Sequence, residues 1–219
     1  MLMFSGGRDS TLAAARLAEK GIPTTLVTLT SVHLFGLAQV RQRLEELARS
    51  LPGETRWMQV VQPTSLRTDT SFYEQTCLPC HHAYVVAAAV LARRFGFGNL
   101  AFGYAGYQAD WPEQTPLAIG RLREVLHRHG LELVLPVYDL TSREAAIAEL
   151  SERGFSVASL EQKCTRQITN VRLAPDRLAA QIDLWERAID ESLEAVEELE
   201  VTVARDQTLS SFVTEVVGP

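Results

Sequence analysis

The chain has 219 residues, of which 46% are hydrophobic and 22% are charged, and its formal net charge is −6. This length and composition suit one α/β domain with a small appendage, and they exclude a fibrous or disulfide-dependent protein. No apolar run reaches the roughly 18 residues of a membrane span and no secretory signal pattern is present, so we expect a cytoplasmic protein with reduced thiols and no membrane partner.

The first third of the chain alternates strand and helix patterns. The expected elements are a strand over 1–4, a helix over 11–20, a strand over 24–29, a helix over 37–50 and a strand over 56–61. Such alternation predicts a parallel sheet with helices on both faces, which is a Rossmann-like three-layer sandwich. Ligands of such sheets bind at the carboxyl ends of the strands.

The pattern continues after a polar loop over 64–76. We expect a buried helix over 83–95, a strand over 99–104, a polar loop over 105–116, a helix over 117–129, a strand over 131–137 and a helix from Ser142 to Arg153. A long helix then runs from Pro175 to about Glu200, with an apolar stripe and an acidic opposite face that suits a packing lid or a homodimer. Residues 201–219 form a strand, a short helix or a frayed end. We therefore divide the chain into a catalytic domain, 1–170, and a C-terminal helical extension, 171–219.

A glycine-containing bend joins the first strand to the first helix, with the sequence Ser5-Gly6-Gly7-Arg8-Asp9-Ser10-Thr11. Two glycines let the backbone turn tightly and approach a bound group, while the helix start offers unpaired N–H groups and its positive dipole end. Phosphate is the usual ligand of such a junction, to which hydroxyl groups and an arginine add donors. The structural alternative is a simple turn in which Asp9 or Ser10 caps the helix.

Three cysteines form the second candidate site. Cys77 and Cys80 make a CxxC pair, and Cys164 stands far downstream. The three thiols can hold a structural zinc together with His81 or His82, hold a 4Fe–4S cluster with one iron left open, or relay sulfur as persulfides. The spacing leaves all three interpretations open.

Further candidate residues lie outside these two motifs. Asp110 and Glu113 follow a sheet strand, where a carboxylate can reach phosphates or Mg²⁺ or can simply face solvent. The net negative charge weighs against tRNA as a partner, unless arginines form a local basic face. The arginines of such a face are Arg41, Arg43, Arg93, Arg94, Arg121, Arg123 and Arg128.

The bend resembles the SGGxDS signature of the PP-loop ATP pyrophosphatases. The match covers Ser5, Gly6, Gly7, Asp9 and Ser10. The resemblance implies that this bend, with Arg8 and Thr11, binds the phosphates of ATP, and that Asp9 is catalytic and orients Mg²⁺. It implies adenylation of a substrate oxygen with release of pyrophosphate. We also expect Thr28, in the second strand, to belong to this nucleotide site.

The cysteines resemble those of the iron–sulfur-dependent tRNA thiolation enzymes, the 2-thiocytidine and 2-thiouridine synthetase group. This implies a 4Fe–4S cluster on Cys77, Cys80 and Cys164, with Cys77 and Cys164 catalytic. It also implies a sulfur donor and an acceptor that is tRNA or a small nucleobase-like molecule. The group usually has Gly-His-His or Gly-His-Asn and paired aspartates where this chain has GYAGYQAD, residues 103–110.

A second resemblance gives the alternative function. Residues 135–141 (LPVYDLT), together with the bend, are similar to the 7-cyano-7-deazaguanine synthases. This implies an ATP-dependent ligase that forms an amide or nitrile and carries Zn²⁺ in place of the cluster. The metal at the cysteines distinguishes the two interpretations.

Overall fold

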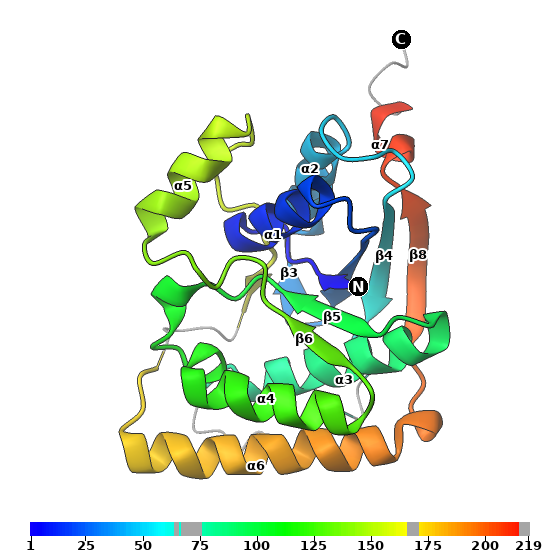
Figure 1. Ribbon diagram of the computed structural model, residues 1–219. Helices are drawn as coiled ribbons and strands as arrows, with labels where there is room; N and C mark the ends of the chain where they lie inside the picture. The colour runs from blue at the N-terminus through cyan, green and yellow to red at the C-terminus, as the bar shows by residue number, and fades with distance from the viewer. Residues whose placement is uncertain (64–65, 67–75, 166–170, 215–219) are drawn as a thin grey trace.

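The computed structural model describes residues 1–63, 66, 76–165 and 171–214 (Figure 1). A six-stranded sheet in the order β6-β5-β1-β2-β4-β8 lies at its centre. Its strands are β1 (Leu2–Met3), β2 (Thr25–Thr30), β4 (Arg56–Val61), β5 (Asn99–Phe102), β6 (Glu132–Val134) and β8 (Thr202–Thr208). The first five run parallel and β8 pairs antiparallel with β4 at one edge.

Seven helices surround this sheet in the described part of the chain. They are α1 (Arg8–Glu19), α2 (Leu37–Leu47), α3 (Leu78–Phe95), α4 (Pro116–Arg128), α5 (Arg143–Glu152), α6 (Pro175–Glu194) and α7 (Ser210–Thr214). Short 3-10 turns are η3 (Gly106–Gln108), η4 (Pro112–Gln114) and η5 (Val196–Glu198). No described helix is long and apolar enough to cross a membrane.

The helices form two layers around separate apolar cores. α1, α2, α5 and α7 lie on one face of the sheet, while α3 and α4 lie on the other (Figure 1). α3 is buried nearly all round because α6 packs across the outside of α3 and α4. The predicted three-layer α/β sandwich is thus confirmed, with α6 as an additional outer helix.

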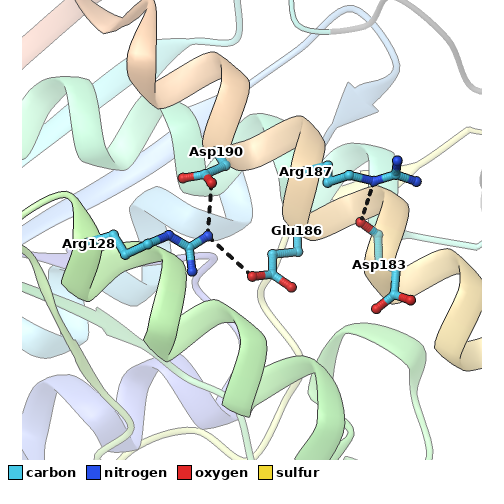
Figure 2. A pocket seen from close by; sticks show the side chains of 5 residues that line it. All are labelled: Arg128, Asp183, Glu186, Arg187 and Asp190. Atoms are coloured by element: carbon cyan, nitrogen blue, oxygen red, sulfur yellow. Dashed lines mark hydrogen bonds and ion pairs between the residues drawn. The ribbon is translucent and has the colours of Figure 1, made fainter.

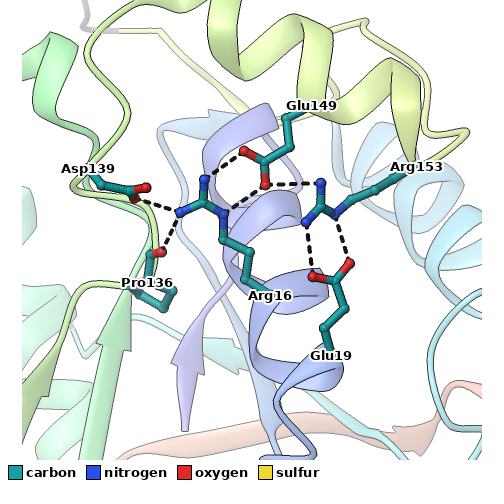
Figure 3. A network of polar contacts seen from close by, with 6 residues as sticks. All are labelled: Arg16, Glu19, Pro136, Asp139, Glu149 and Arg153. Carbon is teal, nitrogen blue, oxygen red and sulfur yellow. Dashed lines mark hydrogen bonds and ion pairs between the residues drawn. The ribbon is translucent and has the colours of Figure 1, made fainter.

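Charged networks fasten the outer helices. Arg16 of α1 donates to both carboxylate oxygens of Glu149 on α5, at 2.7 and 2.6 Å, and to Asp139 at 2.6 Å (Figure 3). On the opposite side, a charged pocket between α4 and α6 contains Arg128, which donates to Asp190 at 2.9 Å and to Glu186 at 3.2 Å (Figure 2). The acidic face of α6 therefore forms ion pairs with α4.

Several element boundaries differ from the sequence prediction. α3 begins at Leu78 instead of residue 83, because a proline is favourable in the first helical turn and Pro79 stands there. α6 ends at Glu194, and the C-terminal segment adds β8 to the main sheet before α7. The polar loop predicted over 64–76 lies mostly outside the described residues.

A small second sheet was not predicted. β3 (Leu34–Phe35) pairs antiparallel with β7 (Lys163–Cys164), and Leu34 lies opposite Cys164. Each strand has two residues, too few for a periodic pattern. This pairing carries Cys164 back to the segment that follows the carboxyl end of β2.

Candidate functional site

The bend between β1 and α1 has the shape of an anion-binding cradle. Gly6 has φ +82°, and an ideal Cβ there would lie 2.9 Å from the carbonyl oxygen of Leu160, so only glycine fits this backbone. α1 begins at Arg8 with Gly7 as its N-cap, which provides no side-chain cap. The first-turn N–H groups and the positive dipole end therefore face the bend without a capping carboxylate or hydroxyl.

Hydroxyl groups brace this bend from within. Thr11 and Ser10 donate to the carbonyl oxygen of Gly7 at 2.7 and 3.2 Å, and Ser5 Oγ accepts from the Gly7 N–H at 3.2 Å. Ser10 and Asp9 lie inside α1, so the prediction that one of them caps the helix is wrong. Arg8 lies at the rim, where its guanidinium donates to the Val157 carbonyl at 3.3 Å.

Thr28 is placed differently from the sequence expectation. Its side chain is buried, donates to the Phe4 carbonyl at 2.8 Å and accepts from the Trp57 indole N–H at 2.9 Å. Both hydrogen-bonding roles of the hydroxyl are therefore filled within the core. The Thr28 hydroxyl therefore links the segment after β1 to β4 within the core.

Asp9 projects from the first turn of α1 toward the segment after β5. The Tyr107 hydroxyl donates to its two carboxylate oxygens at 2.7 and 2.8 Å, and Gln108 Nε2 donates to Oδ2 at 3.2 Å. Burial raises the pKa of Asp9, while the Tyr107 hydrogen bond and the charge of Arg8 oppose that rise. A carboxylate held in one orientation beside a phosphate cradle suits Mg²⁺, which prefers oxygen ligands.

The segment after β5 approaches α1 unusually closely. An ideal Cβ on Gly103 would lie 2.7 Å from the Ser10 nitrogen, so a side chain at Gly103 would collide with the helix start. Of the two carboxylates that the sequence singled out here, Asp110 is 63% exposed and pairs with Arg172 at 2.7 Å. Glu113 is buried and lies 3.6 Å from His81 Nε2. Glu113 therefore belongs to the thiol side of the site, and Asp110 faces outward.

Arg43 is not part of a basic surface, because its side chain is fully buried. It donates to Glu46 at 2.5 Å, to the Ser156 carbonyl at 2.9 Å and to the Ala158 carbonyl at 2.7 Å. Burial lowers the pKa of Arg43, and the charge of Glu46 opposes that decrease. The signal in the sequence was its place on the apolar stripe of α2, between Val40 and Leu44.

The segment that Arg43 holds lies against the bend. An ideal Cβ on Gly7 would stand 3.2 Å from Glu161 Oε2, so this carboxylate is next to the cradle. Burial would raise the pKa of Glu161, but hydrogen bonds from Ser159 and Lys163 bring it below its usual range. Three residues after Glu161 comes Cys164, so one short stretch touches both the bend and the thiol region. Sequence analysis did not identify Glu161.

Two of the three cysteines lie at the start of one helix, and the third comes from a distant strand. Cys77 is the N-cap of α3, Cys80 lies in its first turn, and Cys164 lies in β7. His33 connects them: its Nε2 lies 3.7 Å from Cys80 Sγ, and its carbonyl accepts from the Thr165 N–H at 2.9 Å. The antiparallel β3–β7 pairing thus brings Cys164 to the side of the site where α3 begins.

Electrostatic coupling also joins the thiols. Burial raises the pKa of Cys77 to about 12, and the charges of Glu113, Cys80 and Cys164 add to the rise. Burial and then the three cysteines raise the pKa of Tyr84. This negative, buried environment disfavours the thiolate form of Cys77, so a metal centre bound here would have to supply the positive charge that stabilises it.

The donors near the thiols bear on which metal centre they can hold. In the described part of the chain, no three His, Cys, Asp or Glu side chains gather about a point as a single ion requires. Three cysteine thiolates are donors that a 4Fe–4S cluster uses, and they are also donors that zinc uses. His82 bonds to Ser192 on α6 at 3.0 Å, and His81 bonds to Tyr104 at 2.7 Å, so both histidines have partners other than the thiols.

The strand order, the glycine bend and the two helical layers define a Rossmann-like α/β protein with a PP-loop type of fold. No protein-family profile matches the chain, and no curated protein sequence matches it. Solved structures resemble it. One is a 4-thiouridine synthetase in complex with RNA and bound ATP, with a TM-score of 0.62, 16% identity, and coverage of 93% of this chain and 55% of that chain.

Another is the U34-tRNA thiolase NcsA from Methanococcus maripaludis with its [4Fe–4S] cluster. Its TM-score is 0.51 at 14% identity, over 91% of this chain and 72% of that chain. At these identities the likeness establishes the fold alone. The chain spans about half the length of the 4-thiouridine synthetase that it matches.

Proposed function

We propose that this protein is an ATP-dependent sulfurtransferase that adenylates an oxygen of a nucleobase-like acceptor and replaces it with sulfur. The acceptor is a base in tRNA or a small molecule, and the products include AMP and pyrophosphate. One observation carries the proposal: the glycine bend follows β1, Cys164 pairs with the segment that follows β2, and Cys77 and Cys80 begin the helix that comes after β4. Nucleotide activation and sulfur delivery can therefore meet at one acceptor.

The bend supplies the phosphate-binding part of this reaction. Its main-chain N–H groups and the first turn of α1 would bind the ATP phosphates, with Ser5, Ser10 and Thr11 bracing the loop and Arg8 at the rim. Asp9 would hold Mg²⁺ against those phosphates. The guanidinium of Arg8 and this Mg²⁺ would together stabilise the negative charge that develops when pyrophosphate leaves.

The chemistry then proceeds in two displacements. The acceptor oxygen attacks the α-phosphorus of ATP, the bond to the bridging oxygen breaks, and pyrophosphate leaves with that electron pair. Sulfide from the sulfur donor attacks the activated carbon with its lone pair, the C–O bond breaks, and AMP leaves with the former acceptor oxygen and that electron pair. Adenylation makes the oxygen a good leaving group, and the buried surroundings of Tyr104 would exclude water that competes with sulfur.

Cys77, Cys80 and Cys164 would hold a 4Fe–4S cluster. Such a cluster keeps one iron without a protein ligand and so has a place for the sulfur atom that is transferred. Two side chains would lie close to this cluster. His33 lies against Cys80, and Glu113 adds negative charge near Cys77. The bound ATP and RNA of the 4-thiouridine synthetase and the cluster of the NcsA thiolase support, by likeness of fold, the same set of ligands here.

Anaerobic purification of the full chain tests the metal. We expect a brown protein with about four irons and four sulfides per chain, and loss of most iron in Cys77→Ser, Cys80→Ser and Cys164→Ser. His82→Gln is the matched control, because His82 shares the first turns of α3 with Cys80 but points to α6. A colourless protein with one zinc per chain would overturn the cluster and favour the cyano-deazaguanine type of ligase.

The acceptor is tested with the same protein. Release of AMP and pyrophosphate is measured with ATP, sulfide and either unmodified tRNA or free nucleobases, followed by mass spectrometry of the acceptor. We expect sulfur incorporation that depends on ATP and is lost in Asp9→Asn. Pyrophosphate release without any thiolated product would contradict sulfur transfer.

A further inference from the structure

Asp9 receives donors from two consecutive residues that the SGGxDS signature does not contain. The single Tyr107 hydroxyl proton is shared between Oδ1 and Oδ2, and Gln108 Nε2 adds a second donor to Oδ2. An ionised carboxylate oxygen accepts through two lone pairs. Among the described residues, Oδ2 is therefore filled, while Oδ1 keeps one lone pair for another ligand.

Gln108 is itself held in one orientation. Its Oε1 accepts from Gln114 Nε2 at 2.9 Å, which directs its own NH₂ group toward Asp9. Gln114 is buried, and its Oε1 accepts from the Ala105 N–H at 3.1 Å. A chain of hydrogen bonds thus runs from the main chain after β5, through two amides, to the carboxylate of Asp9.

The backbone around Tyr107 is anchored as well. The Tyr107 N–H donates to the Leu140 carbonyl at 2.9 Å. An ideal Cβ on Gly106 would lie 2.6 Å from the Tyr138 carbonyl oxygen, so the segment fits only with glycine before Tyr107. The phenol ring of Tyr107 is therefore held next to Asp9 by a segment that packs against the loop after β6.

We infer that Tyr107 and Gln108 are positioning residues, which hold Asp9 so that Oδ1 alone binds the Mg²⁺ of Mg–ATP. Mg²⁺ demands near-ideal octahedral geometry at about 2.0–2.1 Å and is usually bound through one or two carboxylates plus phosphate oxygens. A neutral hydroxyl and a neutral amide orient the carboxylate without cancelling its charge, whereas an arginine or lysine in their place would compete with the metal. The inference rests on the proposed ATP site and adds the residues that prepare it.

Binding of ATP to the full chain, with Mg²⁺ or with EDTA, tests this role. In the wild type we expect Mg²⁺ to tighten ATP binding, and in Asp9→Asn we expect that gain to vanish. Tyr107→Phe should reduce the gain by about tenfold, the effect of losing one charge-assisted hydrogen bond, and should leave binding in EDTA unchanged. Thr24→Val is the control, because it also removes one hydroxyl, which donates to the Ile22 carbonyl at 2.9 Å and takes no part in the hydrogen-bond chain to Asp9.

The outcomes separate this inference from the proposed function. If the wild type binds ATP in neither condition, the inference and the ATP site are both overturned. If Mg²⁺ gives no gain in the wild type, or the same gain in Asp9→Asn or Tyr107→Phe as in the wild type, the inference is overturned and the ATP site stands. If Tyr107→Phe does not fold by circular dichroism, Gln108→Leu takes its place, and a gain equal to that of the wild type refutes the inference.

Discussion

The buried Arg43 offers the sharpest test of how this fold supports its site. Arg43→Met keeps an unbranched aliphatic stem in place of that of arginine and removes the charged guanidinium group. The carboxylate of Glu46 and the carbonyl oxygens of Ser156 and Ala158 then lose their donor in a place with little water. Breaking a buried charge pair by removing one partner costs about 3–5 kcal/mol, although the intact pair itself contributes far less because it has been desolvated.

We therefore expect Arg43→Met to lower the free energy of unfolding by about 3–5 kcal/mol, a large share of the ~5–15 kcal/mol typical of a domain. Urea unfolding followed by circular dichroism measures this change. Arg49→Met is the matched control, since Arg49 is exposed just after α2 and its loss should change stability by no more than ~0.5 kcal/mol.

The same variant reports on the bend. Arg43 also donates to the Gly6 carbonyl, at 3.4 Å, and holds the segment that leads to Glu161. Where Arg43→Met still folds at low temperature, its ATP affinity should decrease as well. A loss of stability below about 1 kcal/mol would refute the reasoning. It would mean that water hydrates the acceptors left by Arg43, and that Arg43 does not hold this segment against the bend.

Three further predictions concern stability and the bend. The Arg16 guanidinium lowers the pKa of Glu149 below its usual 4.5, so this stabilisation is complete above pH 4.5 and is lost as pH falls through the folded-state pKa. Glu149→Gln should therefore flatten the acid side of a plot of melting temperature against pH, and an unchanged plot contradicts this. Gly103→Ala should cost about 1–3 kcal/mol and weaken ATP binding, whereas Gly98→Ala, with open space around it, should do neither. Thr28→Val should cost about 1–3 kcal/mol by leaving two buried partners unpaired, with ATP affinity unchanged; a large loss of affinity would return Thr28 to the nucleotide site.

Local patterns explain why much of the architecture was predictable. The β-branched run of β2 and the amphipathic spacing of α2 each lie within one short stretch, so they can be identified without knowing their neighbours. The glycine bend is equally local, because its two glycines, its hydroxyls and Asp9 all stand within seven residues. Strand Arg56–Val61 was predicted with the bounds that the structure has.

Contacts between distant segments were not predictable in this way. The hydroxyl of Tyr107 reaches Asp9 across 98 positions of the chain, and no periodicity connects them. Arg43 looked like a surface charge, because a single arginine on an apolar stripe is buried only when another segment supplies acceptors for it. Similarly, we expected Thr28 to belong to the nucleotide site, whereas its hydroxyl accepts a hydrogen bond from the indole N–H of Trp57 inside the core.

By itself, the sequence determined the alternation of strands and helices, the glycine bend before the first helix and the presence of three thiols, since each depends on neighbouring residues. Only the tertiary structure decided that Cys164 returns to Cys77 and Cys80, that Glu161 lies beside Gly7, and which side chains orient Asp9. The physical reason is that these contacts depend on chain crossings, on two-residue strands and on buried acceptors, which exist only after the sheet has assembled.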